Sequence, residues 1–143
     1  MKNSVVERKL IDFINEYSET SNLYWIPLTK LKKDIPVVAY NQDAIYKNND
    51  IALLENVFKI CGITDVSKFQ MDHLEYFEHD NIFELLYEKD GGDFNFPWYV
   101  ETFYFDFTEQ WLVYVSHEGT ISFTGKKIVE VATKCIDNYK IIN

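Results

Sequence analysis

Two histidines and four carboxylates lie within nine residues of this chain, a composition that could bind a divalent metal ion. The histidines are His73 and His79, and the carboxylates are Asp72, Glu75, Glu78 and Asp80. Their spacing matches no established zinc pattern, such as two histidines four residues apart with a glutamate between them. We therefore expect no metal or other cofactor. A small enzyme or metal-binding domain that uses His73, His79 and the neighbouring carboxylates stays open as the alternative.

The other residues capable of chemistry favour a non-catalytic protein. His117 and Glu118 are adjacent on an expected hairpin, where neighbouring side chains diverge, and no Ser or Cys lies in a recognisable nucleophile setting. The Gly91-Gly92 pair lacks the Lys and Ser/Thr that grip phosphate and magnesium in a phosphate loop. We expect that the protein is not an enzyme.

The negative charge of the chain is concentrated in one segment. Residues 72–109 contain eleven carboxylates and one base, Lys89, so the segment carries −10, and the other 105 residues, with 13 bases and 12 acids, sum to +1. A field of this kind repels nucleic acid, because binding requires Lys and Arg on phosphates. It attracts a basic protein and speeds its encounter.

We therefore predict a partner-binding surface made of carboxylates from this acidic segment. Its members are Glu75, Glu78, Asp80, Glu84, Glu88, Asp90, Asp93 and Glu101. A charge run can also be a solvated face that only keeps the protein soluble, and this second reading stays open.

Length and composition indicate one globular domain over residues 1–143. The chain is 47% hydrophobic, which argues against disorder. No stretch approaches the roughly 18 apolar residues of a membrane span, and the N-terminus has no signal-peptide pattern. We expect a cytoplasmic protein with no membrane contact. Cys61 and Cys135 lie on the apolar faces of expected helices, where free cysteine acts as a small packing residue.

Apolar residues at three- and four-residue spacing predict helices over residues 4–17, 50–61 and 126–139. A fourth helix over 81–88 is predicted by the cap spacing of Asn81 and Glu84 and by the Gly91-Gly92 pair that follows it. Asp50 and Asn81 occupy the cap positions of the helices over 50–61 and 81–88, and Gly62 follows the first of these, where a left-handed terminator belongs. The pattern over 65–78 fits either a helix or a strand.

An aromatic block dominates the C-terminal half. Residues 94–124 hold eleven of the 24 Phe, Trp and Tyr residues, in three β-like runs over 98–106, 110–116 and 120–124. Between the last two runs, Gly119 suits a hairpin turn that requires a positive φ. Both faces of these strands are apolar, so either helices cover both faces or one aromatic face stays open for a partner.

These elements predict an α+β fold. We expect an antiparallel sheet of about four to five strands with a C-terminal three-stranded meander, packed by the N- and C-terminal helices. Short extended segments over 23–28 and 36–40 add to the sheet, and Pro27 and Pro36 confine them to its edges.

The block from Pro97 to Gly125, followed by a helix, reads PWYVETFYFDFTEQWLVYVSHEGTISFTG. It resembles the C-terminal part of small uncharacterised proteins of Gram-positive bacteria, some of which resemble immunity proteins that neutralise secreted polymorphic toxins. The resemblance implies a partner-binding role and an α+β fold with an antiparallel sheet. It assigns a function to no individual residue.

Overall fold

A computed structural model of the chain describes residues 36–70, 75–87, 102–106, 108, 110–116 and 119–141, with the backbone alone at 69–70 and 75–80. The predicted helix over 4–17 and the extended segment over 23–28 lie outside these residues.

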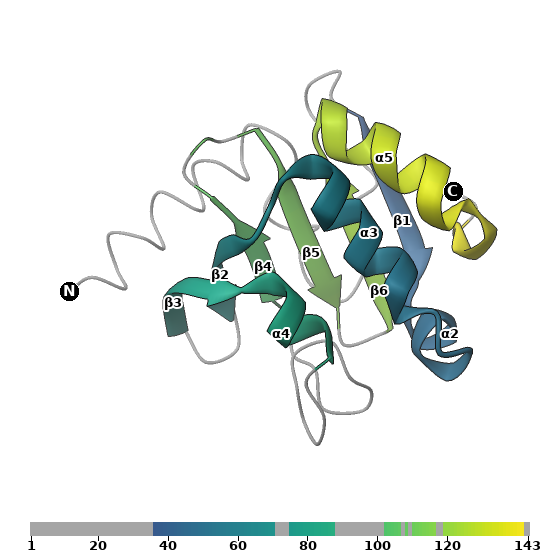
Figure 1. Ribbon diagram of the computed structural model, residues 1–143, viewed down its shortest axis with the longest axis horizontal. Coiled ribbons are helices and arrows are strands. Elements are labelled where there is room, and N and C mark those ends of the chain that lie inside the picture. Colours follow the sequence, from purple (N-terminus) through teal and green to yellow (C-terminus); the bar gives the residue numbers. More distant parts are fainter. Residues whose placement is uncertain are drawn as a thin grey trace.

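Within the described residues, six strands form one antiparallel sheet in the spatial order β1-β6-β5-β4-β2-β3 (Figure 1). The strands are β1 (Val37–Asn41), β2 (Asp65–Gln70), β3 (Glu75–Asn81), β4 (Thr102–Phe105), β5 (Leu112–Ser116) and β6 (Thr120–Thr124). Strands β4, β5 and β6 are consecutive neighbours, which confirms the C-terminal meander. Strand β1 lies at an edge, as Pro36 immediately before it led us to expect.

The described sheet contains four of the expected strands and two more, because the ambiguous segment over 65–78 falls within the hairpin of β2 and β3. The helical alternative for this segment is therefore wrong for the described residues. Its β2 strand lies between β4 and β3, so that Phe69 is opposite both Phe103 and Tyr76. Pairing with a neighbouring strand decides between two local patterns of similar strength.

The helices are α2 (Gln42–Lys47), α3 (Ile51–Cys61), α4 (Ile82–Tyr87) and α5 (Lys126–Ile136), with a 3-10 turn, η2 (Asp137–Tyr139), after the last. Helices α3 and α5 pack side by side against one face of the sheet (Figure 1). The structure thus has the predicted α+β fold. Helix α2 was not predicted, and its first turn is held by the Asn41 side chain and the Gly119 carbonyl, which accept from Ala44 N at 3.0 Å and Gln42 N at 2.8 Å.

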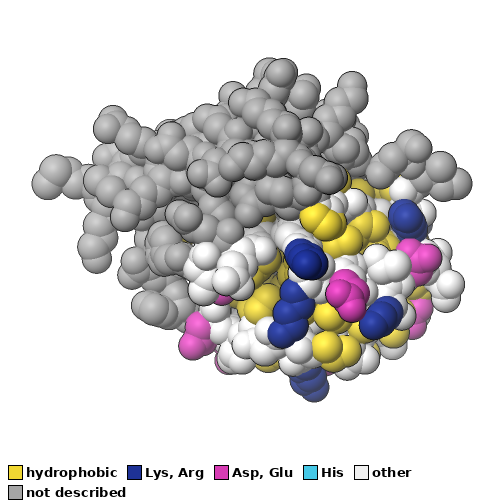
Figure 2. Space-filling model, turned by 90° about the horizontal axis from the view of Figure 1, so that it is seen from above, with side chains coloured by type: hydrophobic (Ala, Val, Ile, Leu, Met, Phe, Trp, Pro, Cys, Tyr) yellow, Lys and Arg dark blue, Asp and Glu magenta, His cyan; other side chains and the backbone are white. Residues whose placement is uncertain are grey.

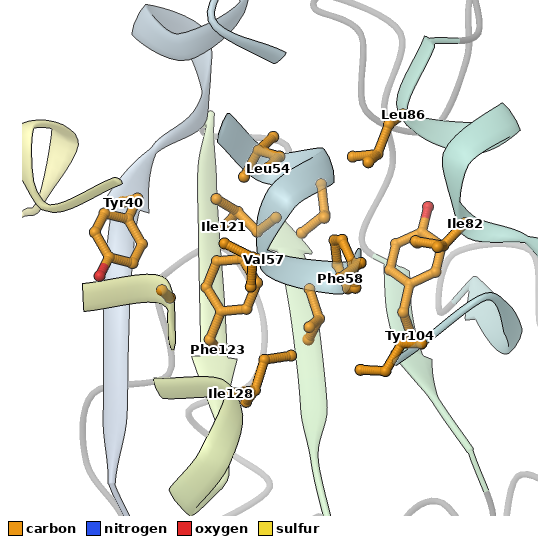
Figure 3. Close-up of a cluster of buried hydrophobic side chains, with 14 of the residues drawn as sticks. Tyr40, Leu54, Val57, Phe58, Ile82, Leu86, Tyr104, Ile121, Phe123 and Ile128 are labelled. Atoms are coloured by element: carbon orange, nitrogen blue, oxygen red, sulfur yellow. The ribbon is translucent and has the colours of Figure 1, made fainter. Parts of the chain in front are cut away.

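The core lies between the helices and the sheet. Phe58 of α3 packs on Phe123 of β6, with ring centroids 6.1 Å apart, and Tyr40 of β1 meets the same ring edge-on at 5.9 Å. Tyr104 of β4 lies beside Ile82 at the α4 end of the cluster (Figure 3). All five side chains are fully buried, and burial of each large apolar side chain contributes about 1.5–3 kcal/mol to folding.

The opposite face of the central strands is buried as well. Phe103 of β4 and Tyr114 of β5 stack with ring centroids 4.7 Å apart, and neither is exposed. Leu112 and Phe105 on the same face are 0% and 5% exposed. The alternative of an open aromatic face is therefore wrong for these strands.

The expected caps lie where the sequence predicted them, whereas the last helix, predicted over 126–139, is α-helical only to Ile136 and continues as the 3-10 turn η2. Gly62 ends α3 at φ +72°, and the Asn81 carboxamide accepts from Phe83 N at 2.9 Å and Glu84 N at 3.3 Å to cap α4. Asp50 precedes α3 but makes no side-chain cap bond, because its carboxylate accepts a hydrogen bond from the Tyr139 hydroxyl instead. Asp50 thus occupies the predicted N-cap position, but the expected side-chain cap bond is wrong, and the carboxylate connects α3 to the C-terminal turn.

Two glycines at positive φ allow a matched test of the β5–β6 turn. Gly119 has φ +85° and a Cβ there would overlap the Asp43 carboxylate, whereas a Cβ on Gly62 meets nothing within 4 Å. We expect Gly62→Ala to cost about 1–2 kcal/mol from left-handed strain. Gly119→Ala should cost more, because Asp43 must also move. Urea unfolding of both variants measures the difference, and equal losses would contradict the close approach to Asp43.

Candidate functional site

The predicted partner-binding carboxylates divide into two groups. Glu75, Glu78 and Asp80 belong to β3, and Glu84 is an exposed residue of α4, the helix that directly follows it. The remaining four, Glu88, Asp90, Asp93 and Glu101, lie outside the described residues. The structure therefore brings half of the predicted set onto one edge strand and its adjoining helix. We call this unit, residues 75–87, the acidic edge.

The two edges of the sheet differ. The outer side of β1 pairs with the end of the chain, where Lys140 forms a bridge with Tyr40 and Ile141 N donates to Ala39 O at 2.9 Å. In the described part of the chain, β3 pairs with β2 alone. The β2–β3 register also shifts between Val66 and Lys68. Charged residues and bulges on an edge strand hinder pairing with a second copy of the same sheet.

The predicted histidine cluster is placed only in part. His79 belongs to β3, while His73, His117 and Glu118 lie outside the described residues, as does the Gly91-Gly92 pair. Among the described side chains, no group of three or more His, Cys, Asp or Glu residues could hold a metal ion. The metal hypothesis stays a prediction about the segment around β3.

A cavity that the sequence did not reveal lies at the end of the sheet where α3 ends and α5 begins. Its volume is about 410 Å³. Three short stretches supply the lining: Cys61, Gly62, Ile63, Thr64 and Asp65 from the α3–β2 connection, Asp106, Thr108, Gln110 and Trp111 from the β4–β5 turn, and Lys127 and Ile128 from α5. Gly62 allows the chain to leave α3 sharply and run into β2 along this wall.

The β4–β5 turn is locked by one carboxylate. The Trp111 indole Nε1 donates to Asp106 Oδ2 at 2.8 Å, and Thr108 N donates to Oδ1 at 3.0 Å, joined there by the Thr108 hydroxyl. Trp111 is only 6% exposed. Because both Asp106 oxygens accept hydrogen bonds from the turn, this residue positions the indole on the cavity wall. The Asp-x-Thr spacing was the available sequence signal for this turn.

Three other polar side chains of the cavity, Asp65, Lys127 and Cys61, differ from the hydrogen-bonded Asp106. Asp65 and Lys127 are exposed and, within the described part of the chain, form no hydrogen bond or ion pair with each other. Burial raises the pKa of the Cys61 thiol, which outweighs the lowering effect of the Lys127 ammonium. The thiol therefore stays protonated at neutral pH and is a poor nucleophile.

Comparisons with known proteins give no further guide to this site. No protein-family model matches the chain, and neither the curated proteins nor the solved structures include a significant match. Among the described helices, none is long and apolar enough to cross a membrane.

Asp106 and Asp65 form a matched pair for testing whether the hydrogen bonds of Asp106 stabilise the β4–β5 turn. Asp106→Ala removes the acceptor of the buried Trp111 N–H, and an unsatisfied buried donor costs about 1–3 kcal/mol. Asp65→Ala removes the same charge from the same cavity at an exposed position, so the free energy of unfolding should change by no more than about 0.5 kcal/mol. Urea unfolding compares the two, and a similar loss in both would show that the Trp111 bond does not stabilise the turn.

The metal alternative has its own test. We expect Zn²⁺ or Mn²⁺ to leave the melting temperature unchanged, since a ligand that binds the folded state would raise it. Differential scanning fluorimetry with each ion measures this. A stoichiometric increase that disappears in His73→Ala or His79→Ala would overturn our expectation and favour the enzyme or metal-binding reading.

Proposed function

We propose that this protein is a non-catalytic binding module, most concretely an immunity protein that acts in the cytoplasm. Its partner is a basic protein, such as the C-terminal nuclease domain of a secreted toxin. The acidic edge and the carboxylates that follow it would cover the basic substrate groove of the toxin. Nucleic acid and membranes are not partners in this proposal.

The observation that carries the proposal is the position of the acidic segment relative to the folded sheet. Glu75, Glu78 and Asp80 belong to an edge strand, and Glu84 is exposed on the helix after it. Among the described strands, β3 pairs only with β2, whereas the side chains of the central strands β4 and β5 are buried. Complementary fields act mainly on association rate and on the choice of partner.

The helical layer presents a different electrostatic surface. Lys59 pairs with Glu55 at 2.8 Å on α3, and Lys134 pairs with Glu130 at 3.6 Å on α5. The described part of the surface in Figure 2 likewise mixes Lys with Asp, Glu and hydrophobic side chains. A basic partner is therefore directed away from this layer and toward the acidic edge.

The edge position also explains how an acidic strand can serve a partner without causing aggregation. Like charges on β3 repel the β3 strand of a second copy, which suppresses edge-to-edge pairing. The same charges attract a basic chain. One arrangement thus supports both solubility and partner choice.

Charge reversal tests the proposal. The partner is first sought by co-expression and pull-down with the product of the neighbouring gene, which should encode a large secreted protein with a toxic C-terminal domain. We expect Glu78→Lys, Asp80→Lys and Glu84→Lys combined to slow association strongly at low salt. Steering can raise association rates from about 10⁵–10⁶ to roughly 10⁸ M⁻¹s⁻¹. Stopped-flow measurements at two ionic strengths should also show a flatter salt dependence, since charges are screened over about 10 Å at 0.1 M.

Residues on the helical layer provide the matched control. Glu130→Lys and Asp137→Lys reverse exposed charges outside the acidic segment and should slow association much less per charge. If the acidic-edge variant associates as fast as the wild type at low salt, the steering proposal is wrong and the acidic run is a solvated face.

A further inference from the structure

The cavity between α3, the β4–β5 turn and α5 has the composition of a small-molecule site. Ile63, Trp111 and Ile128 are 9%, 6% and 2% exposed and supply an apolar floor. Thr64, Asp65, Thr108, Gln110 and Lys127 supply exposed polar groups at its rim. A volume of about 410 Å³ lies within the range of roughly 300–1,000 Å³ that is usual for ligand pockets, and such pockets combine an apolar lining with a few polar groups.

The charges of the cavity restrict what it can bind. Asp65 at the start of β2 offers a carboxylate, and Lys127 in the first turn of α5 offers an ammonium. Asp106 is occupied by its bonds to Thr108 and Trp111. A simple anion would be repelled by two carboxylates. A divalent cation would meet Lys127 and find only one carboxylate that is not already engaged in the turn.

We propose that this cavity binds a small zwitterion of the amino-acid class with a large apolar side chain. The ammonium of the ligand contacts Asp65, its carboxylate contacts Lys127, and its side chain packs against Trp111 and Ile128. This site is separate from the acidic edge and does not depend on the proposed protein partner. Because both charged side chains lie at an exposed rim, each contributes modestly, and the affinity is weak.

Three related probes separate the two charged contacts. L-Phenylalanine carries both groups, N-acetyl-L-phenylalanine lacks the ammonium, and L-phenylalanine amide lacks the carboxylate. Titrations of the full chain followed by ¹H–¹⁵N NMR should show saturable binding of L-phenylalanine, with shifts at the Trp111 indole N–H. Each analogue should bind about fivefold more weakly.

The variants Asp65→Asn and Lys127→Gln complete the test. Asp65→Asn should bind L-phenylalanine and its N-acetyl form equally, and Lys127→Gln should bind L-phenylalanine and its amide equally. Lys134→Gln and Asp137→Asn, which change exposed charges outside the cavity, should behave as the wild type, and amide spectra of every variant verify the fold. The proposal fails if the wild type shows no saturable binding of L-phenylalanine, or if the discrimination between probes survives both cavity variants.

Discussion

Burial of the central strands on both faces is the constraint on which the rest of the structure depends. Every residue of β5 is buried, as are all four of β4. Helices α3 and α5 supply the cover on one side, where Phe58 and Ile128 meet Phe123. A strand in this position has no exposed face for a ligand or a partner. Polar side chains that could contact a ligand or a partner therefore lie at the edges and ends of the sheet.

The two edge strands of the described sheet differ in what lies beside them. Strand β1 is closed by the residues after η2, through the Ile141 bond to Ala39. Strand β3 instead carries three carboxylates and is joined to β2 with a register shift. An edge that is charged and irregular is poorly suited to pairing with copies of itself. The structure therefore adds a location to the negative charge of the acidic segment, because three of its carboxylates belong to an edge strand.

The cavity results from the same layered arrangement. Gly62 ends α3, and α5 begins directly after β6, where Gly125 closely approaches the backbone of Gln110 and Trp111 in the β4–β5 turn. The Asp106–Trp111 bond fixes an indole at this junction and satisfies the one polar atom of a buried ring. Three chain segments that are distant in sequence thus form one wall, and Asp65 and Lys127 lie at its rim.

The sequence by itself determined the local elements with strong periodicity or specific turn chemistry. The spacing of apolar residues predicted α3 and α5, and the cap spacing of Asn81 and Glu84 predicted α4. Gly62 and Gly119 marked a terminator and a turn, because both positions require a positive φ. The alternation in the aromatic block likewise predicted the meander and its two apolar faces.

Only the tertiary structure decided the features that depend on contacts between distant segments. Residues 65–78 fitted two local patterns, and strand pairing with β4 selected one of them. Asp50 suited a cap, but Tyr139, far along the chain, provided a competing hydrogen bond. The cavity joins residues 61–65 to residues 106, 108, 110 and 111 and to residues 127–128, and no periodicity within any of these stretches encodes that approach. Local propensities act over a few residues, whereas a site of this kind exists only when the layers have packed.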